Sequence, residues 1–99
     1  MVQRRSPRRQ RLQEELGENI RRWRRVNGMS ASELAERAAV SRVTLRNIET
    51  GVTSARVDSL LAILTALGVV DRVIESTDPY RNDAARVRID EILGAGGSL

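Results

Sequence analysis

The apolar residues of this chain recur three or four positions apart over most of its length, which is typical of helices that bury one side. In the first such segment, residues 10–27, the apolar positions are Leu12, Leu16, Ile20 and Trp23. Gly28 then ends the predicted helix. We expect this stripe to pack in a core, with base stacking as the alternative for Trp23, the single tryptophan.

Two short helices joined by a tight turn are predicted between Ser30 and Gly51. Ser30 and Glu33 form a capping box, in which the serine hydroxyl accepts a backbone N–H and the glutamate reaches back. The apolar side of this helix consists of Leu34, Ala35 and Ala38. Ser41 is placed to cap the second helix, whose inner side carries Leu45 and Ile48.

The remaining chain predicts two or three further helices. Ser54 is placed to cap a fourth helix, whose core side is Val57, Leu60, Leu61, Leu64 and Leu67. A short apolar cluster follows Gly68 and consists of Val69, Val70, Val73 and Ile74. So small a domain has little left to cover this cluster, so we expect a second subunit to do so. Asp78 and Pro79 predict the start of a last helix, with a shared face at Ala85, Ile89, Ile92 and Leu93.

Composition narrows the possible chemistry. The chain has 99 residues, enough for one helical core, and it contains neither cysteine nor histidine. This inventory excludes thiol catalysis, disulfides, zinc-finger ligation and a histidine-based triad, and we expect no metal and no cofactor. No apolar run approaches the roughly 20 residues that span a bilayer. We therefore expect a cytoplasmic protein without a membrane partner.

Positive charge is concentrated at the amino-terminal end. All seventeen basic residues are arginines, and the net charge is +4. Residues 1–25 contain nine arginines and three glutamates, a net +6, whereas residues 26–99 contain eight arginines and ten acids, a net −2. Residues 1–9 contain almost nothing apolar, so we expect a disordered basic arm that is either a solvated terminus or a DNA contact.

The outward side of the helix at residues 41–50 predicts contact with DNA bases. Each residue advances a helix by about 100°, so this side carries Arg42, Val43, Arg46 and Asn47. These residues present two guanidinium groups, one carboxamide and one isopropyl group. An arginine can bond guanine with two hydrogen bonds, an asparagine can bond adenine, and a small apolar group can touch a thymine methyl. We interpret these four residues as candidate base readers.

The segment from Leu16 to Leu67 resembles the helix-turn-helix domain of the lambda-repressor/Cro-like (Xre-type) family. The positions that carry the resemblance are Leu16-Gly17, Ile20, Gly28-Met29-Ser30, Glu33-Leu34-Ala35, Val40-Ser41, Thr44, Ile48-Glu49, Gly51, Leu60-Leu61, Leu64 and Ala66-Leu67-Gly68. Two positions depart from it. Ala31 stands where the family usually has a glutamine that touches phosphate, and Ala39 stands where it usually has a glycine, in a turn that favours φ > 0.

The resemblance implies roles for several residues. It pairs Arg24 with Glu49 in a structural salt bridge. It implies contacts with the DNA backbone from the start of the second helix, the start and end of the third, and the following loop, at Ser30, Ala31, Ser32, Ser41, Thr44, Thr50, Thr53, Ser54 and Arg56. It also implies that the cluster of Val69, Val70, Val73 and Ile74 makes the dimer contact.

The expected fold is therefore all-α, a five- to six-helix lambda-repressor-like DNA-binding domain with a C-terminal extension helix. The expected organisation is a disordered arm at residues 1–9, a helix-turn-helix domain at 10–75, and a C-terminal helix and flexible tail at 76–99. That last segment, which faintly resembles the ends of HipB-like antitoxins, is expected to contact either the dimer partner or another protein.

The expected function is regulation of transcription, as a homodimeric repressor on a palindromic site in double-stranded DNA. The alternative is an antitoxin, which neutralises a toxin protein and represses its own operon. A protein that binds single-stranded RNA is expected to stack bases on aromatic side chains. The chain has one Trp and one Tyr, which argues against this class. An enzyme is the least favoured class, because no nucleophile–base pair is evident.

Overall fold

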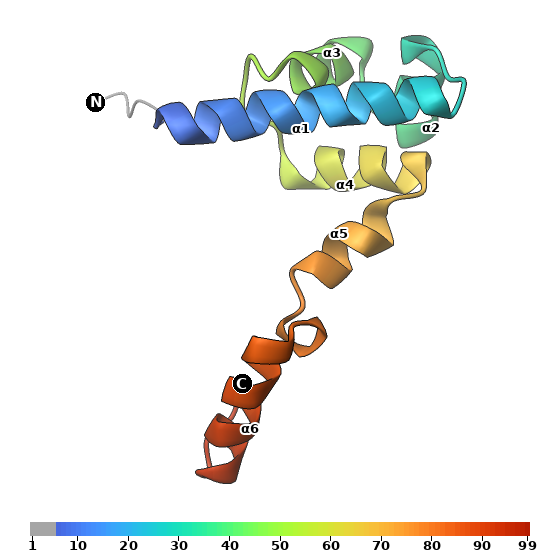
Figure 1. Ribbon diagram of the computed structural model, residues 1–99. Coiled ribbons are helices and arrows are strands. Elements are labelled where there is room, and N and C mark those ends of the chain that lie inside the picture. The colour runs from blue at the N-terminus through green and yellow to red at the C-terminus, as the bar shows by residue number, and fades with distance from the viewer. Residues whose placement is uncertain (1–5) are drawn as a thin grey trace. The chain divides into compact units, whose positions relative to one another are not determined.

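The computed structural model describes residues 6–99, which form six α-helices and one 3₁₀ helix and contain no strand (Figure 1). The helices are α1 (Pro7–Val26), α2 (Ala31–Ala38), α3 (Arg42–Thr50), α4 (Val57–Leu67), α5 (Val70–Ser76), η1 (Pro79–Arg81) and α6 (Asp83–Gly94). The chain divides into two compact units, of which the first ends at Val69 and the second comprises Val70–Leu99. The expected all-α fold with a C-terminal helix is confirmed. None of the helices in the described part is long and apolar enough to cross a membrane.

Helix α1 begins earlier than the apolar pattern indicated. Ser6 is its N-cap and accepts a hydrogen bond from the Arg9 N–H at 3.1 Å, and Pro7 takes the first helical position. The end of the expected disordered arm, residues 7–9, is therefore helical. The prediction for residues 1–5 lies outside the described residues.

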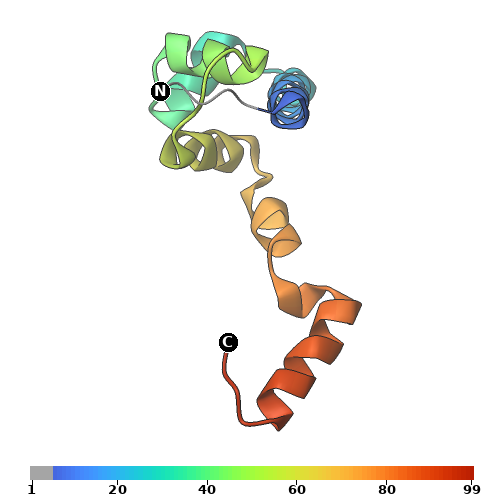
Figure 2. The ribbon, with the colours of Figure 1, turned by 90° about the vertical axis from the view of Figure 1, so that its left-hand side faces the viewer.

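The core of the first unit lies where α1, α2, α3 and α4 meet. In Figure 2, which looks along α1, this helix lies beside α3 and α4. The core side chains are Ile20, Met29, Leu34, Ala35, Ala38, Leu45, Ile48, Ile63, Leu64 and Leu67. Leu34 and Ile63 are fully buried, on helices that pack directly against each other. Each of the four helices therefore contributes apolar surface to one shared core.

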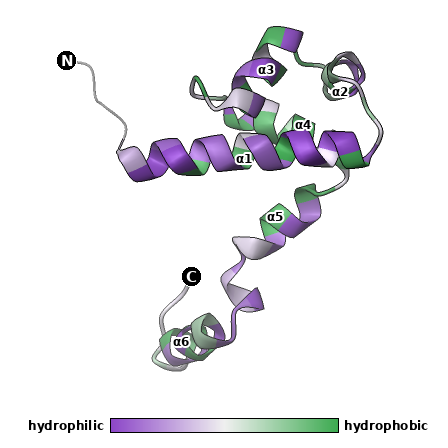
Figure 3. Ribbon diagram, turned by 45° about the horizontal axis from the view of Figure 1, so that its top comes forward, coloured by the Kyte–Doolittle hydropathy of each residue, from purple (hydrophilic) through white to green (hydrophobic). Residues whose placement is uncertain are grey.

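The expected burial of the α1 stripe is wrong for three of its four residues. Ile20 is buried, but Leu12, Leu16 and Trp23 are each at least 40% exposed. The residues that α1 presents inward are Gly17 and Ile20, because α1 approaches α3 closely at Gly17. The rest of the stripe therefore lies at the rim of the core. Figure 3 shows that α1 consists mainly of hydrophilic residues, drawn in purple, with fewer hydrophobic ones between them.

The turn between α2 and α3 has the conformation that the family resemblance implied. Ser30 and Glu33 form the capping box at the start of α2. Ala39 ends that helix with φ 54° and ψ 40°, and among the described residues it is the one non-glycine with positive φ. Its β-carbon in this conformation costs about 1 kcal/mol, which the turn tolerates.

Helix α4 differs from the prediction at both its start and its core side. Its N-cap is Arg56 rather than Ser54. Ile63 is completely buried although the pattern had not singled it out, whereas Val57 is exposed. Apolar residues follow one another closely along α4, so their spacing did not indicate which side faces the core. The packing of α4 against α2 determines that side.

The second unit begins its last helix later than expected. Asp78 and Pro79 start the short helix η1, and the chain is then extended at Asn82, with φ −116° and ψ 124°. Asn82 caps α6 by accepting the Ala85 N–H at 2.8 Å. Within Val70–Leu99 only Ile89 is buried. Most apolar side chains of this unit are therefore accessible.

Candidate nucleic-acid interface

Helix α3 is held by its apolar side, which leaves a polar side facing outward. Leu45 and Ile48 are buried, whereas Arg42, Val43 and Arg46 are exposed. Ser41 caps the helix by accepting the Thr44 N–H at 3.0 Å. The predicted division of α3 into an inner and an outer side is thus what the structure contains.

Two glycines allow α1 to lie directly against the last turn of α3. A β-carbon on Gly17 would lie 2.2 Å from the Ile48 carbonyl oxygen. Gly51 ends α3 with φ 68°, and a β-carbon there would lie 2.8 Å from the Glu14 Cα. Backbone therefore meets backbone at both points, which sets the position of α3 relative to α1.

Arg24 and Glu49, which the resemblance pairs, form a two-point ion pair between α1 and α3. The Arg24 Nε lies 2.8 Å from one Glu49 carboxylate oxygen, and Nη2 lies 3.0 Å from the other. Arg24 Nη1 also donates to the Met29 carbonyl at 3.1 Å. Hydrogen bonding to Glu49 raises the pKa of the Arg24 guanidinium, although partial burial opposes this shift. The bridge neutralises a carboxylate that would otherwise repel phosphate beside the outer side of α3.

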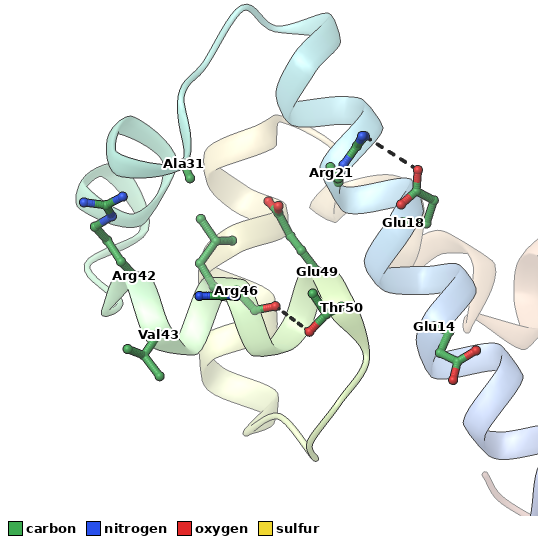
Figure 4. Close-up of a pocket in the computed structure, with 10 residues that line it drawn as sticks. Glu14, Glu18, Arg21, Ala31, Arg42, Val43, Arg46, Glu49 and Thr50 are labelled. Atoms are coloured by element: carbon green, nitrogen blue, oxygen red, sulfur yellow. Dashed lines mark hydrogen bonds and ion pairs between the residues drawn. The ribbon is translucent and has the colours of Figure 1, made fainter.

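An open hollow of about 780 Å³ runs along the outer side of α3 (Figure 4). Its α3 wall includes Arg42, Val43, Arg46 and Thr50. Ala31 borders it at the start of α2, and Glu14, Glu18 and Arg21 border it from α1. Three of the four candidate base readers therefore line one concave surface, together with the first residue of α2.

Asn47, the fourth candidate base reader, lies elsewhere. It is half-buried and lines a separate pocket of about 140 Å³ with the loop after α3. Thr44, Thr53, Ser54 and Arg56 line the same pocket. Each residue advances a helix by about 100°, so Asn47, which directly follows Arg46, lies on a different flank of α3 from Arg42 and Arg46. Asn47 therefore lies beside several of the candidate backbone contacts, and its role as a base reader stays a prediction.

Several candidate backbone contacts already take part in local hydrogen bonds. The Ser41 hydroxyl donates to Thr44 Oγ1 at 2.8 Å, and the Thr50 hydroxyl donates to the Arg46 carbonyl at 2.8 Å. Arg56 lies 3.2 Å from Asp58, which offsets its charge. Ser30 is exposed and its hydroxyl accepts the Glu33 N–H in the capping box. Ser32, Thr53 and Ser54 are also exposed, and Ala31 is half-buried.

Three residues that the sequence pattern had not singled out border or support this surface. Arg21 lines the hollow, and its guanidinium lies 3.6 Å from Glu18. Gln10 and Gln13 donate to the carbonyl oxygens of Gly51 and Thr53 in the loop after α3. A row of polar residues at helical spacing along α1 was a signal for Arg21, but nothing in the sequence indicated the two glutamine contacts.

Residues 15–76 match the family model described as a helix-turn-helix domain. The match covers more than half of the chain, and the protein belongs to this family. No individual curated protein and no solved structure gives a significant match. The family is one of DNA-binding regulators, and the hollow along α3 lies on the helix that follows the turn.

Proposed function

We propose that the protein is an Xre-type repressor that binds a specific sequence of double-stranded DNA as a homodimer and acts in the cytoplasm by occluding a promoter. One observation carries this proposal: Arg42, Val43 and Arg46 are exposed on α3 and line one concave surface. The helix behind them is anchored by buried side chains and by the Arg24–Glu49 bridge. A rigid helix that presents forked donors suits the major groove.

The surroundings of α3 support a division of roles between bases and phosphates. Arg42 and Arg46 each offer a guanidinium fork to guanine, and Val43 offers methyl groups to thymine. The exposed N–H groups at the start of α2 suit a phosphate, which also makes Ala31 tolerable, since its backbone N–H remains. Residues 10–75 would then form the DNA-binding part and residues 76–99 the part that contacts a protein.

The decisive experiment measures what one arginine contributes to sequence preference. An operator is first found by footprinting the DNA upstream of the gene. Arg46→Ala should then weaken operator binding by about 1 to 3 kcal/mol and relax the preference at one base pair. Arg37→Ala, at the far end of α2, is the control. Equal losses on operator and random DNA would assign Arg46 to phosphate and count against base reading.

Dimerisation through α5 is the second part of the proposal. Val69 and Val70 are half-buried, Val73 and Ile74 are exposed, and α5 buries none of its residues. A twofold dimer would place two α3 helices about 34 Å apart, so half-sites should be centred about 10 bp apart. Ile74→Asp should shift the protein to the monomer in sedimentation velocity. A dimer that persists in this variant would refute the assignment of the interface to α5.

The HipB-like antitoxin remains a second candidate because of the second unit. Helix α6 leaves Val87, Ile92 and Leu93 exposed, which is the kind of surface that a protein partner covers. Co-expression with the product of the neighbouring gene tests this function. Copurification and rescue of growth from that product would establish an antitoxin, whereas a harmless or non-binding neighbour would leave the plain repressor.

A further inference from the structure

The first two turns of α1, residues 7–14, lie outside the family match yet are joined to the candidate interface. We call these residues the α1 extension. Gln10 Nε2 donates to the Gly51 carbonyl at 3.0 Å, and Gln13 Nε2 donates to the Thr53 carbonyl. Close contact between Gly51 and Glu14 adds a third attachment. The extension is therefore positioned by the loop that follows α3, and Figure 1 shows α1 continuing beyond that loop.

The extension is strongly basic, whereas the loop is not. Arg8, Arg9 and Arg11 are exposed, and none of them forms an ion pair with another residue between 6 and 99. The loop at residues 51–56 contains one charged residue, Arg56, which is paired with Asp58. The available positive charge beside the loop therefore comes from α1.

The position of these arginines is unfavourable for the helix itself. The amino-terminal end of a helix carries partial positive charge and favours acidic residues, yet the first turn of α1 contains none. Arg8 and Arg9 occupy that turn instead. The arginines stand where a helix favours acidic residues, and no ion pair in the described chain compensates for this. Their position therefore indicates a function outside the fold.

Helical geometry connects the extension with the hollow beside α3. Glu14, Glu18 and Arg21 border that hollow and follow one another at spacings of four and three. Arg11 precedes Glu14 by three positions and so continues the same row toward the start of α1. Arg11 thus lies on the side of α1 that borders the hollow, but nearer to the start of α1 than the residues that line it.

We propose that Arg8, Arg9 and Arg11, held against the loop by Gln10 and Gln13, bind DNA phosphates beside those that the loop contacts. The extension supplies the positive charge that the loop lacks. This inference depends on the proposed binding of duplex DNA, but it concerns residues outside the family match. It assigns Gln10 and Gln13 as positioning residues, since they act through the loop and not on the DNA.

Phosphate contacts are independent of sequence, so the test needs no operator. Binding of the full chain to a fluorescein-labelled duplex of random sequence is measured by anisotropy over a range of salt concentrations. Removing one arginine that binds a phosphate should reduce the slope of log K against log salt by about 0.9. For Arg11→Ala we expect the slope to fall by about 0.9 per protomer. When Arg8 and Arg9 are also replaced by alanine, the slope should fall by nearly three times as much. Arg37→Ala removes the same charge from the end of α2 and should leave the slope unchanged.

A charge-neutral variant tests the positioning. Gln10→Leu combined with Gln13→Leu keeps every arginine but removes both loop hydrogen bonds, so the slope should again fall. Circular dichroism verifies that this variant remains folded, and Gln10→Leu alone is used if it does not. An unchanged slope in folded glutamine variants would overturn the docking of the extension on the loop.

Failure of the inference and failure of the proposed function give different results. A wild-type chain that binds no duplex at any salt concentration would refute DNA binding altogether. A chain that binds duplex with the same slope before and after the arginine replacements would refute only the phosphate contacts of the extension.

Discussion

Gly17→Ala tests the close contact on which the placement of α3 depends. The added methyl carbon would lie 2.2 Å from the Ile48 carbonyl oxygen and 2.7 Å from that of Glu49. Both atoms belong to the backbone of α3, so no side-chain rotation relieves the clash. Either α1 moves away from α3 or the last turn of α3 is distorted.

Two opposing effects set the expected size of the change. In an open helix interior, replacing glycine with alanine stabilises by about 0.5 to 1 kcal/mol. Overpacking of a closely packed site costs about 1 to 3 kcal/mol, and occasionally more. Because the contacts here are with backbone, we expect the clash to prevail and the protein to lose about 1 to 2 kcal/mol. For a domain of this size that lowers the melting temperature by roughly 4 to 8 °C per kcal/mol.

The assay is thermal and urea unfolding of the full chain, monitored by circular dichroism at 222 nm. Gly94→Ala is the matched control, because it also lies in a helix and a β-carbon there meets no atom within 4 Å. Its stability should stay the same or rise slightly. If Gly17→Ala melted at or above the wild-type temperature, backbone contact with α1 could not be what positions α3.

Three further predictions concern the helix-turn-helix and its supports. Ala39→Gly should stabilise the protein by up to about 1 kcal/mol, because glycine adopts the left-handed conformation without strain; a lower urea midpoint would contradict this. Arg24→Ala should destabilise by about 3 kcal/mol, since it leaves the Glu49 carboxylate unpaired, and restoration of most of the loss by adding Glu49→Gln would verify that cause. Ser41→Ala should cost about 1 kcal/mol through loss of the α3 cap, measured by the same unfolding assay, and an unchanged midpoint would show that the cap contributes little.

The predictions that succeeded depend on neighbours along the chain. The left-handed turn at Ala39 was implied by the family resemblance. The capping box at Ser30 and the inward direction of Leu45 and Ile48 follow from spacings of three or four residues. Such spacings determine which residues share one side of a helix. They are set by the backbone and need no knowledge of the partner helix.

The predictions that failed depend on how one helix rotates against another. Trp23 belongs to the apolar stripe of α1 but lies at its rim, because α1 turns Gly17 toward α3. Val57 belongs to the predicted core side of α4 but is exposed, whereas Ile63, which the pattern did not single out, is fully buried. The spacing of apolar residues gives no information on how a helix is rotated against its neighbour. The packing of the two helices decides this rotation.

By itself, the amino-acid sequence determined an all-α chain with a turn between two short helices and with arginines on the exposed side of the second. Hydrophobic periodicity and capping chemistry are local, so they can be read without a structure. Only the tertiary structure decided that Arg42 and Arg46 share a hollow with Arg21, and that Gln10 and Gln13 hold the loop after α3. Those contacts join positions up to 41 residues apart, and they form only where two helices approach closely enough for backbone and side chains to meet.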